Sequence, residues 1–305
     1  MASQTISGWN VLVSGASGFI GSHLLPVLAG AGAQGQSLVR RPARNDSEVS
    51  WDPSGAIDAS RFEGLDAVVH LAGEPITGRW IASKKQRILQ SRKQDTAQLA
   101  ASLAQCRQKP RVLLCASAIG YYGDRGDELL HEESASGSDF LSEVGRAWEA
   151  ATVPAAQAGI RVVNLRIGIV LSPRGGALKQ MLPPFKLGLG GRLGSGRQYM
   201  SWIALDDVLG AIRHALRTDS LRGPVNAVAP NPVTNAEFTR TLGQVLHRPT
   251  IFPVPAFAVR LLFGEMGQAL LLTSQRVEPA RLLAAGFSFK HPELKGALEA
   301  VLKNR

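Results

Sequence analysis

A glycine-rich segment near the N-terminus constrains the fold more than any other feature of the sequence. Residues 15–21 (GASGFIG) have the spacing G-x-x-G-x-x-G, directly after the apolar run 11–14 and before a helical pattern. The first glycine permits a tight turn, the second lets the backbone approach a pyrophosphate, and the third lets helix pack on strand. Free N–H groups at the helix N-terminus then hold the phosphates. A merely tight turn is the alternative, but strand, turn, helix and second strand within about 30 residues favour dinucleotide binding.

The end of the second strand indicates which dinucleotide is bound. A pocket for the unphosphorylated cofactor places an acid about 20 residues after the glycines, on the ribose hydroxyls. This chain has Arg40 and Arg41 there, and the nearest acids downstream are Asp46 and Glu48. Two guanidinium groups suit a 2′-phosphate, so we expect NADP as the cofactor. The alternative is a solvated basic turn, because arginines are mostly exposed.

Short apolar runs alternate with helical patterns in the first half of the chain. The expected strands lie at about 11–14, 37–39, 67–71, 111–115 and 161–165, and the expected helices at about 19–29, 84–105 and 140–158. This alternation indicates βαβ units and a buried parallel sheet. With right-handed crossovers, it predicts an α/β fold with a doubly wound, mostly parallel Rossmann sheet.

The character of the sequence changes after Gly168. Residues 173–196 are rich in glycine and proline, and the C-terminal third is interrupted by prolines. We therefore expect an NADP-binding Rossmann domain at 1–172 and a smaller substrate lobe at 173–305. The lobe is expected to end in a small helical domain, with some segments returning to the Rossmann sheet.

Composition excludes several classes of protein. The 305 residues are 45% hydrophobic and 19% charged, which is typical of a globular chain. Two cysteines and six scattered histidines give no disulfide framework, and we expect no metal site. The net charge is +10, but its densest run, 84–87 (KKQR), has no interleaved aromatic residue, so no nucleic-acid partner is expected. Without a signal peptide or an apolar run long enough to span a bilayer, a cytoplasmic protein is expected.

Several phrases resemble the extended branch of the short-chain dehydrogenase/reductases, whose members are epimerase-like Rossmann proteins. These phrases are 70–73 (HLAG), 117–123 (SAIGYYG), and 194–198 (GSGRQ) leading to Asp206 and Asp207. An atypical subgroup of NADP-dependent, epimerase-family oxidoreductases with a short C-terminal domain is the most specific match. Its phrases stand at 70–80 (HLAGEPITGRW), Ser91-Arg92, Trp148-Glu149, 182–194 (LPPFKLGLGGRLG) and 253–262 (PVPAFAVRLL). The resemblance covers essentially the whole chain.

The resemblance implies a set of contacts with NADP. They are Gly15, Ser17, Gly18, Phe19, Ile20, Gly21, Arg40, Arg41, Leu71, Ala72, Gly73, Arg87, Arg92 and Ile167. Without the resemblance, Arg87 and Arg92 would be assigned to the solvated face of a basic helix.

The usual acid–base pair of the superfamily is missing. Standard members carry Tyr-x-x-x-Lys on a helix, where the lysine lowers the pKa of the proton-shuttling tyrosine. The residues four positions after the three tyrosines of this chain are Arg125, Gly126 and Ile203. The atypical subgroup shares this lack. In nucleotide-sugar epimerases an arginine usually precedes the acids of the substrate lobe by a few residues. Residues 199–201, which precede Asp206 and Asp207 here, contain no arginine, and this disfavours a nucleotide-sugar substrate.

Three residues are candidate substitutes for the missing acid. Ser117 and Tyr122 come just after a strand, where ligands bind in open sheets, and Glu74 follows another strand. Each also has a simpler interpretation. Ser117 could form a turn, Tyr122 could be an aromatic residue packed in a loop, and Glu74 could be a charged residue at the start of a helix.

The sequence therefore predicts an NADP(H)-binding, epimerase-like oxidoreductase acting on a small carbonyl or alcohol substrate. The rival prediction is a non-catalytic NADPH-binding regulator or scaffold that has lost the acid–base pair. A small molecule is the expected partner, membrane association is not expected, and a homodimer is left open.

Overall fold

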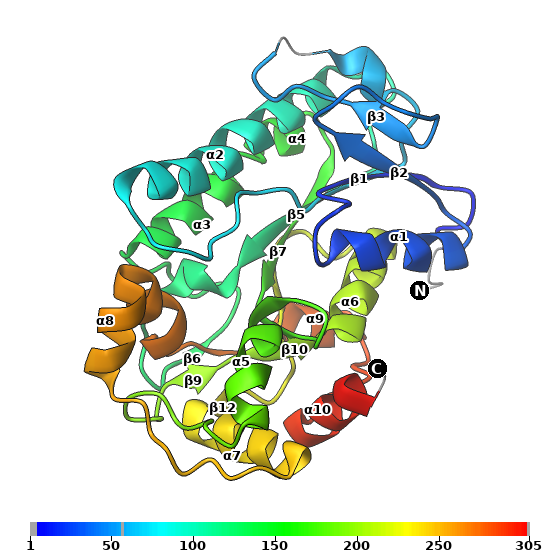
Figure 1. Ribbon diagram of the computed structural model, residues 1–305. Coiled ribbons are helices and arrows are strands. Elements are labelled where there is room, and N and C mark those ends of the chain that lie inside the picture. The colour runs from blue at the N-terminus through cyan, green and yellow to red at the C-terminus, as the bar shows by residue number, and fades with distance from the viewer. Residues whose placement is uncertain (1–4, 56–57, 304–305) are drawn as a thin grey trace.

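The computed structural model describes residues 5–55 and 58–303, and at its centre is a seven-stranded parallel sheet (Figure 1). The strand order is β3-β2-β1-β4-β5-β7-β11. The strands are β1 (Asn10–Ser14), β2 (Gln34–Val39), β3 (Glu48–Ser50), β4 (Ala67–His70), β5 (Val112–Ala118), β7 (Arg161–Ile167) and β11 (Gly223–Ala227). The direction of the winding reverses between β1 and β4, and open sheets bind ligands at such a point. The predicted α/β, doubly wound Rossmann sheet is confirmed.

Successive residues of each strand pack against helices on opposite faces of the sheet. Val11 and Val13 of β1 belong to the core beneath α1 (Gly21–Gly30) and α6 (Leu205–Arg217). Leu12, between them, belongs to the core beneath α2 (Ala82–Gln105) and α4 (Val153–Gln157). Apolar side chains of the strand therefore point to both faces of the sheet, and helices bury both faces, as is usual for a parallel sheet.

Two local predictions were wrong. The expected helix 140–158 is divided into α3 (Phe140–Ala150) and α4, because Pro154 has no N–H with which to continue a helical ladder. The stretch after β2, which showed no strand pattern, contains the short edge strand β3, paired with β2 through Leu38 and Val49.

The second lobe packs helices around short strands. Its core includes Trp202 and Phe238, both fully buried, and it is built on α5 (Gly176–Lys186), α7 (Asn235–Leu246) and α10 (Leu294–Lys303). Its short strands form two pairs, β8 (Ile169–Leu171) with β10 (Trp202–Ala204), and β9 (Tyr199–Met200) with β12 (Val233–Thr234). The remaining elements are η1 (Ala59–Phe62), η2 (Ile119–Tyr122), β6 (Leu129–Leu130), α8 (Ala256–Gly267), η3 (Gln268–Leu272), β13 (Arg276–Val277) and α9 (Ala280–Ala284).

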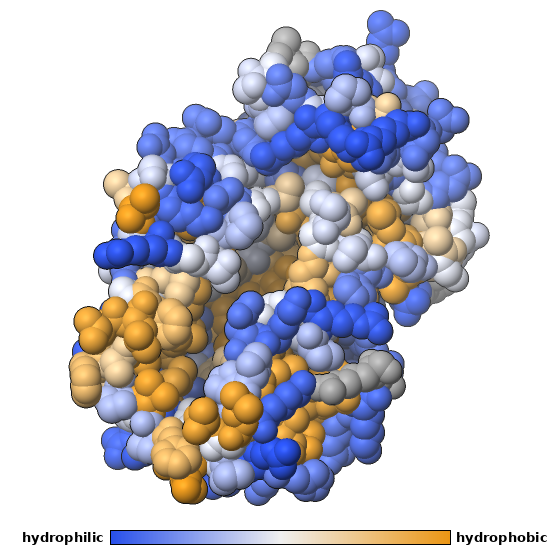
Figure 2. All heavy atoms as spheres, viewed as in Figure 1, coloured by the Kyte–Doolittle hydropathy of each residue, from blue (hydrophilic) through white to orange (hydrophobic). Residues whose placement is uncertain are grey.

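The chain returns from the second lobe to the sheet. Helix α6 covers one face of the sheet, and β11 pairs with β7 at its edge, although both follow residue 172. Figure 2 shows the surface hollowed between the Rossmann part and the lobe, with apolar atoms on the floor of the hollow. None of the described helices is long and apolar enough to cross a membrane.

Candidate functional site

The glycine turn after β1 is as compact as the spacing predicts. Gly15 has a φ of +67°, and a Cβ there would lie 2.9 Å from the backbone nitrogen of Ala72. A Cβ on Gly21 would lie 2.3 Å from the carbonyl oxygen of Gly15. Both positions therefore require glycine, the first for the turn itself and the third for the approach of α1. Gly18 is exposed, with its N–H bonded to the Gly15 carbonyl at 2.9 Å.

Backbone donors at this turn are left free. Among the described residues, the N–H groups of Ser17, Phe19 and Ile20 have no acceptor. Helix α1 starts directly after them, with no side-chain cap and no acid in its first turn. The Phe19 ring packs on the second lobe, since a Cβ on Gly175 would lie 2.4 Å from it. The turn thus presents unpaired donors at the positive end of a helix, an arrangement suited to an anion.

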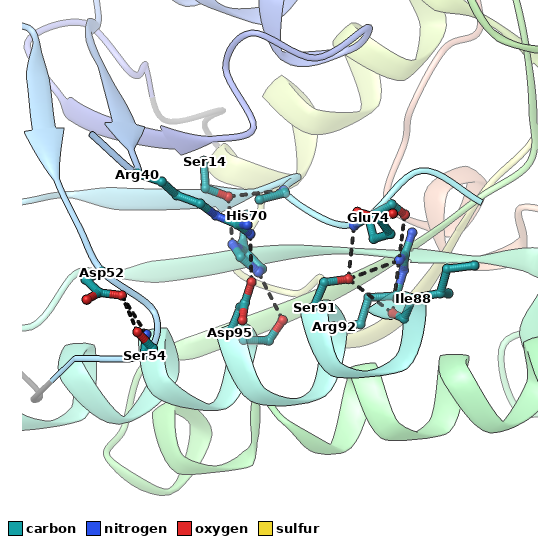
Figure 3. A network of polar contacts seen from close by, with 12 residues as sticks. Ser14, Arg40, Asp52, Ser54, His70, Glu74, Ile88, Ser91, Arg92 and Asp95 are labelled. Carbon is teal, nitrogen blue, oxygen red and sulfur yellow. Dashed lines mark hydrogen bonds and ion pairs between the residues drawn. The ribbon is translucent and has the colours of Figure 1, made fainter. Parts of the chain in front are cut away.

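A buried polar network fixes the end of β4 against the end of β1 (Figure 3). The Ser14 hydroxyl oxygen accepts the N–H groups of Leu71 and Ala72, at 3.1 and 3.2 Å. Its own hydrogen then points to Nδ1 of His70 at 2.7 Å, so that His70 donates from Nε2 to Thr96 at 3.0 Å. Burial, helped by two nearby arginines, lowers the pKa of His70 to about 4 and keeps the ring neutral.

The two arginines after β2, Arg40 and Arg41, pair with different acids. Arg41 makes a two-pronged ion pair with Glu48, at 2.6 and 2.7 Å, and hydrogen bonds from Arg41 lower the pKa of Glu48 to about 2. Arg40 makes one contact with Asp95 of α2, at 2.7 Å, and its side chain remains 56% exposed. Figure 3 shows the Arg40 side chain extending toward Asp95. Arg40 is therefore the better placed of the two for a ligand at the β1–β4 crevice.

Glu74 is held as an ionised carboxylate. Its Oε1 accepts from Lys84 Nζ at 2.7 Å and lies 3.4 Å from Arg87 Nε. The hydrogen bond from Lys84, followed by that from Arg87, lowers the pKa of Glu74. This state does not suit the proposed role of Glu74 as a proton donor at neutral pH.

The buried side chain of Arg92 stabilises the segment that follows β4. Its side chain is buried, lies over the Trp148 ring at 4.7 Å, and donates to the carbonyl oxygen of Glu74 at 3.0 Å. A Cβ on Gly73 would lie 3.2 Å from its guanidinium group. Arg92 thus holds the segment that follows β4, whereas Leu71 and Ala72 stay partly exposed at the crevice and Gly73 is exposed.

Ser117, at the end of β5, belongs to a buried ionic cluster. Its hydroxyl donates to Oε1 of Glu149 at 2.8 Å. The same carboxylate accepts from Nε and Nη2 of Arg166, at 2.8 and 2.9 Å, and the Arg166 side chain is only 2% exposed. Burial lowers the pKa of Arg166, but the hydrogen bonds that Arg166 donates to Glu149, together with its electrostatic interactions with Tyr122 and Glu149, outweigh burial and raise this pKa. Ile167, the next residue, is partly exposed at the end of β7.

Tyr122, a candidate acid, lies inside the protein. Its side chain is fully buried, and its hydroxyl lies 2.7 Å from Asn226 Oδ1 and 2.9 Å from the Arg166 guanidinium. Burial raises the pKa of Tyr122 to about 12. The hydroxyl is bonded inside the protein, which does not favour the expected role of Tyr122 as a proton donor.

Tyr121 is a residue that the sequence reasoning passed over. It is partly exposed at the end of β5, and the Arg166 guanidinium lies 3.6 Å from its ring centroid. The ring lies over Gly145 of α3, where an added Cβ would be 3.2 Å from Tyr121. Among the described residues, its hydroxyl has no hydrogen-bond partner. One signal was available: Asn164 and Arg166 interrupt the apolar residues of 162–167, which indicates a buried polar cluster beneath that edge.

Comparison with known proteins agrees with this geometry. Residues 11–227 match the NAD dependent epimerase/dehydratase family, and residues 254–301 match a domain of unknown function, DUF1731. The epimerase family protein Mb2239 of Mycobacterium bovis is 45% identical over 290 residues, which cover 94% of this chain and 96% of that protein.

Two solved structures are also similar. The crystal structure of human epimerase family protein SDR39U1 with NADPH is 35% identical, with a TM-score of 0.89 over 97% of this chain and 100% of that one. The structure of a nucleoside-diphosphate sugar epimerase from Corynebacterium glutamicum is 38% identical, with a TM-score of 0.80. It aligns over 97% of this chain and 58% of its own length.

The family match runs from β1 to β11, so it includes every strand of the central sheet and the crevice between β1 and β4. The C-terminal match begins just before α8 and accounts for the end of the second lobe. This chain therefore belongs to the NAD-dependent epimerase/dehydratase family, as an atypical extended short-chain dehydrogenase/reductase.

Proposed function

We propose that this chain binds NADP(H) and acts as an oxidoreductase on a small carbonyl or alcohol substrate. The observation that carries the proposal is the set of unpaired N–H groups on Ser17, Phe19 and Ile20, at the N-terminus of α1. Such donors bind a pyrophosphate, and glycines at positions 15 and 21 keep the turn compact enough to present them. The related human protein, whose crystal structure includes NADPH, supports the choice of nucleotide.

The preference for the phosphorylated cofactor is expected to depend mainly on Arg40. A charged hydrogen bond to a 2′-phosphate is strong, but the exposed position of Arg40 and its contact with Asp95 reduce the gain. We expect Arg40→Ala to weaken NADPH binding about tenfold or more, and to leave NADH binding nearly unchanged. Arg41→Ala is the matched control and should have a smaller effect, because Arg41 is engaged by Glu48.

Both dissociation constants should be measured by calorimetry at low and at high salt. The preference for NADPH should decline with salt, since the arginine is open to solvent. Equal affinities of the unmodified protein for NADPH and NADH would show that these arginines form only a solvated turn.

For the chemical step, Tyr121 replaces Tyr122 as the proposed proton donor. When bound, the nicotinamide supplies the hydride for carbonyl reduction. The Tyr121 hydroxyl donates its proton to the carbonyl oxygen and regains one from solvent. Arg166, fixed by Glu149 against the Tyr121 ring, supplies the positive charge that the absent lysine would provide.

This assignment predicts opposite behaviour for two adjacent tyrosines. Tyr121→Phe should slow NADPH-dependent reduction of 9,10-phenanthrenequinone, or of an aldehyde from a test panel, by about 100-fold or more. NADPH affinity should not change. Tyr122→Phe should leave the chemical step nearly intact and lower stability, because it removes the hydroxyl oxygen that accepts a buried hydrogen bond from Arg166. Normal turnover by Tyr121→Phe would remove Tyr121 from this role.

The rival proposal, a non-catalytic NADPH-binding regulator or scaffold, has specific support. Ser117 is buried and bonded to Glu149, and Glu74 is ion-paired, so neither suits proton transfer. Tight NADPH binding without NADPH oxidation on any carbonyl in the panel would favour the regulator.

A further inference from the structure

The second lobe exposes a large apolar surface. Six side chains between 45% and 81% exposed lie on α8 and on the segment that leads into it. We call them the α8 face: Ile251, Phe252, Phe257, Leu261, Leu262 and Phe263. Figure 2 shows apolar atoms gathered over α8 and along that segment. Exposed apolar surface of this extent marks an interaction site rather than ordinary scatter.

Helix α8 is held to the protein by few of its residues. Only Val259 and Gly267 of the helix are buried, and the second half of α8 is exposed around Gly264, where the backbone is not helical. The α8 face continues onto the neighbouring loop, because Val254 pairs with Leu193 and the loop carries the exposed Leu187 and Leu189. The second lobe therefore exposes further apolar side chains besides those of the α8 face.

The charge of the molecule is concentrated in the same lobe. The 34 lysines and arginines divide evenly, 17 in residues 1–172 and 17 in residues 173–305. The 24 acids do not divide evenly: 16 lie in the first segment and 8 in the second. The net charges are thus +1 and +9. Residues 205–227, which return to the sheet, hold three basic and three acidic residues, so nearly all of the excess of +10 lies in the lobe that bears the α8 face.

Basic side chains flank the α8 face directly. These side chains belong to Lys186, Arg192, Arg248 and Arg260. Arg260 is on α8, and the carbonyl oxygen of Arg192 accepts the N–H of Val254. The Arg248 side chain donates to the carbonyl oxygen of Lys186 at 2.9 Å. All four are exposed, and none forms an ion pair within residues 5–55 and 58–303.

We propose that the α8 face docks on an anionic membrane surface. The aromatic and leucine side chains would enter the headgroup region with α8 parallel to the surface, and the flanking cations would face lipid phosphates. A second copy of the chain suits this face less well, because it would bring together two lobes that each carry +9. This peripheral attachment needs no membrane-spanning helix and does not depend on the nucleotide site.

The test is flotation of the full chain with vesicles of phosphatidylcholine, with and without phosphatidylglycerol. We expect binding to the anionic vesicles, little binding to the neutral ones, and a marked loss at high salt. Leu261→Ser with Leu262→Ser should weaken binding by more than about tenfold. Lys186→Gln with Arg248→Gln should weaken it about thirtyfold, since each cation near an anionic surface contributes about a factor of five.

A matched control is Val153→Ser with Leu283→Ser, which removes two exposed apolar side chains outside the α8 face. It should bind as the unmodified protein does, and circular dichroism should show that every variant is folded. Failure to bind anionic vesicles, or equal loss in the control, overturns the proposal. A dimer in light scattering that Leu261→Ser with Leu262→Ser dissociates would also overturn it and assign the face to a second copy.

Discussion

Gly18→Asp is expected to abolish NADPH binding while the fold remains intact. A Cβ at this position would lie 3.0 Å from the Gly15 carbonyl oxygen, and the carboxylate would extend into the space next to the free N–H groups of Ser17 and Phe19. The new negative charge competes for these donors and repels the pyrophosphate. Loss of two or three charge-assisted hydrogen bonds corresponds to about a thousandfold in dissociation constant.

Calorimetric titration with NADPH measures the effect, and circular dichroism checks the fold. Gly296→Asp is the matched control, because Gly296 is exposed on α10 and a Cβ there meets nothing within 4 Å. The control should bind NADPH normally. If Gly18→Asp retained its affinity, the turn after β1 would not be the pyrophosphate site.

The second large effect concerns the buried cluster beneath Tyr121. Glu149→Ala should destabilise the protein by about 3–5 kcal/mol, because it leaves the Arg166 guanidinium buried without its carboxylate. It also removes the acceptor of the Ser117 hydroxyl. Urea unfolding measures the loss, with Glu128→Ala as the control, since the Arg125–Glu128 pair is exposed and should contribute less than about 1 kcal/mol.

The double variant Glu149→Leu with Arg166→Met separates charge from packing. It should recover much of the lost stability, because removing both charges is less costly than leaving one buried alone. An effect of Glu149→Ala no larger than that of Glu128→Ala would show that solvent reaches the cluster.

The sequence predicted the fold well because its signals are local. The spacing of three glycines, apolar runs of strand length and the position of Arg40 after the second strand each depend on a few neighbouring residues. The missed strand β3 is short and holds one apolar residue, Val49, so it has no period from which it could be recognised.

The candidate site was harder to predict because it depends on direction and long-range partners. Tyr121 and Tyr122 are adjacent, and only the turn of η2 decides which ring faces inward. Glu48 was visible downstream of Arg41, but the sequence does not reveal that β3 brings the two together. Arg166 and Glu149 come from different elements, so their pairing follows from the sheet and helix packing rather than from any motif.

The return of the chain to the sheet has a consequence for how the protein is made. Until the ribosome has synthesised β11, strand β7 has an open edge, and one face of the sheet lacks the cover that α6 provides. An unpaired edge and an uncovered apolar face both favour aggregation. Because domains fold as units during synthesis, the nucleotide-binding half can be completed only after about three quarters of the chain has been made. At that point α5 of the second lobe has been synthesised, but α7 and α10 have not.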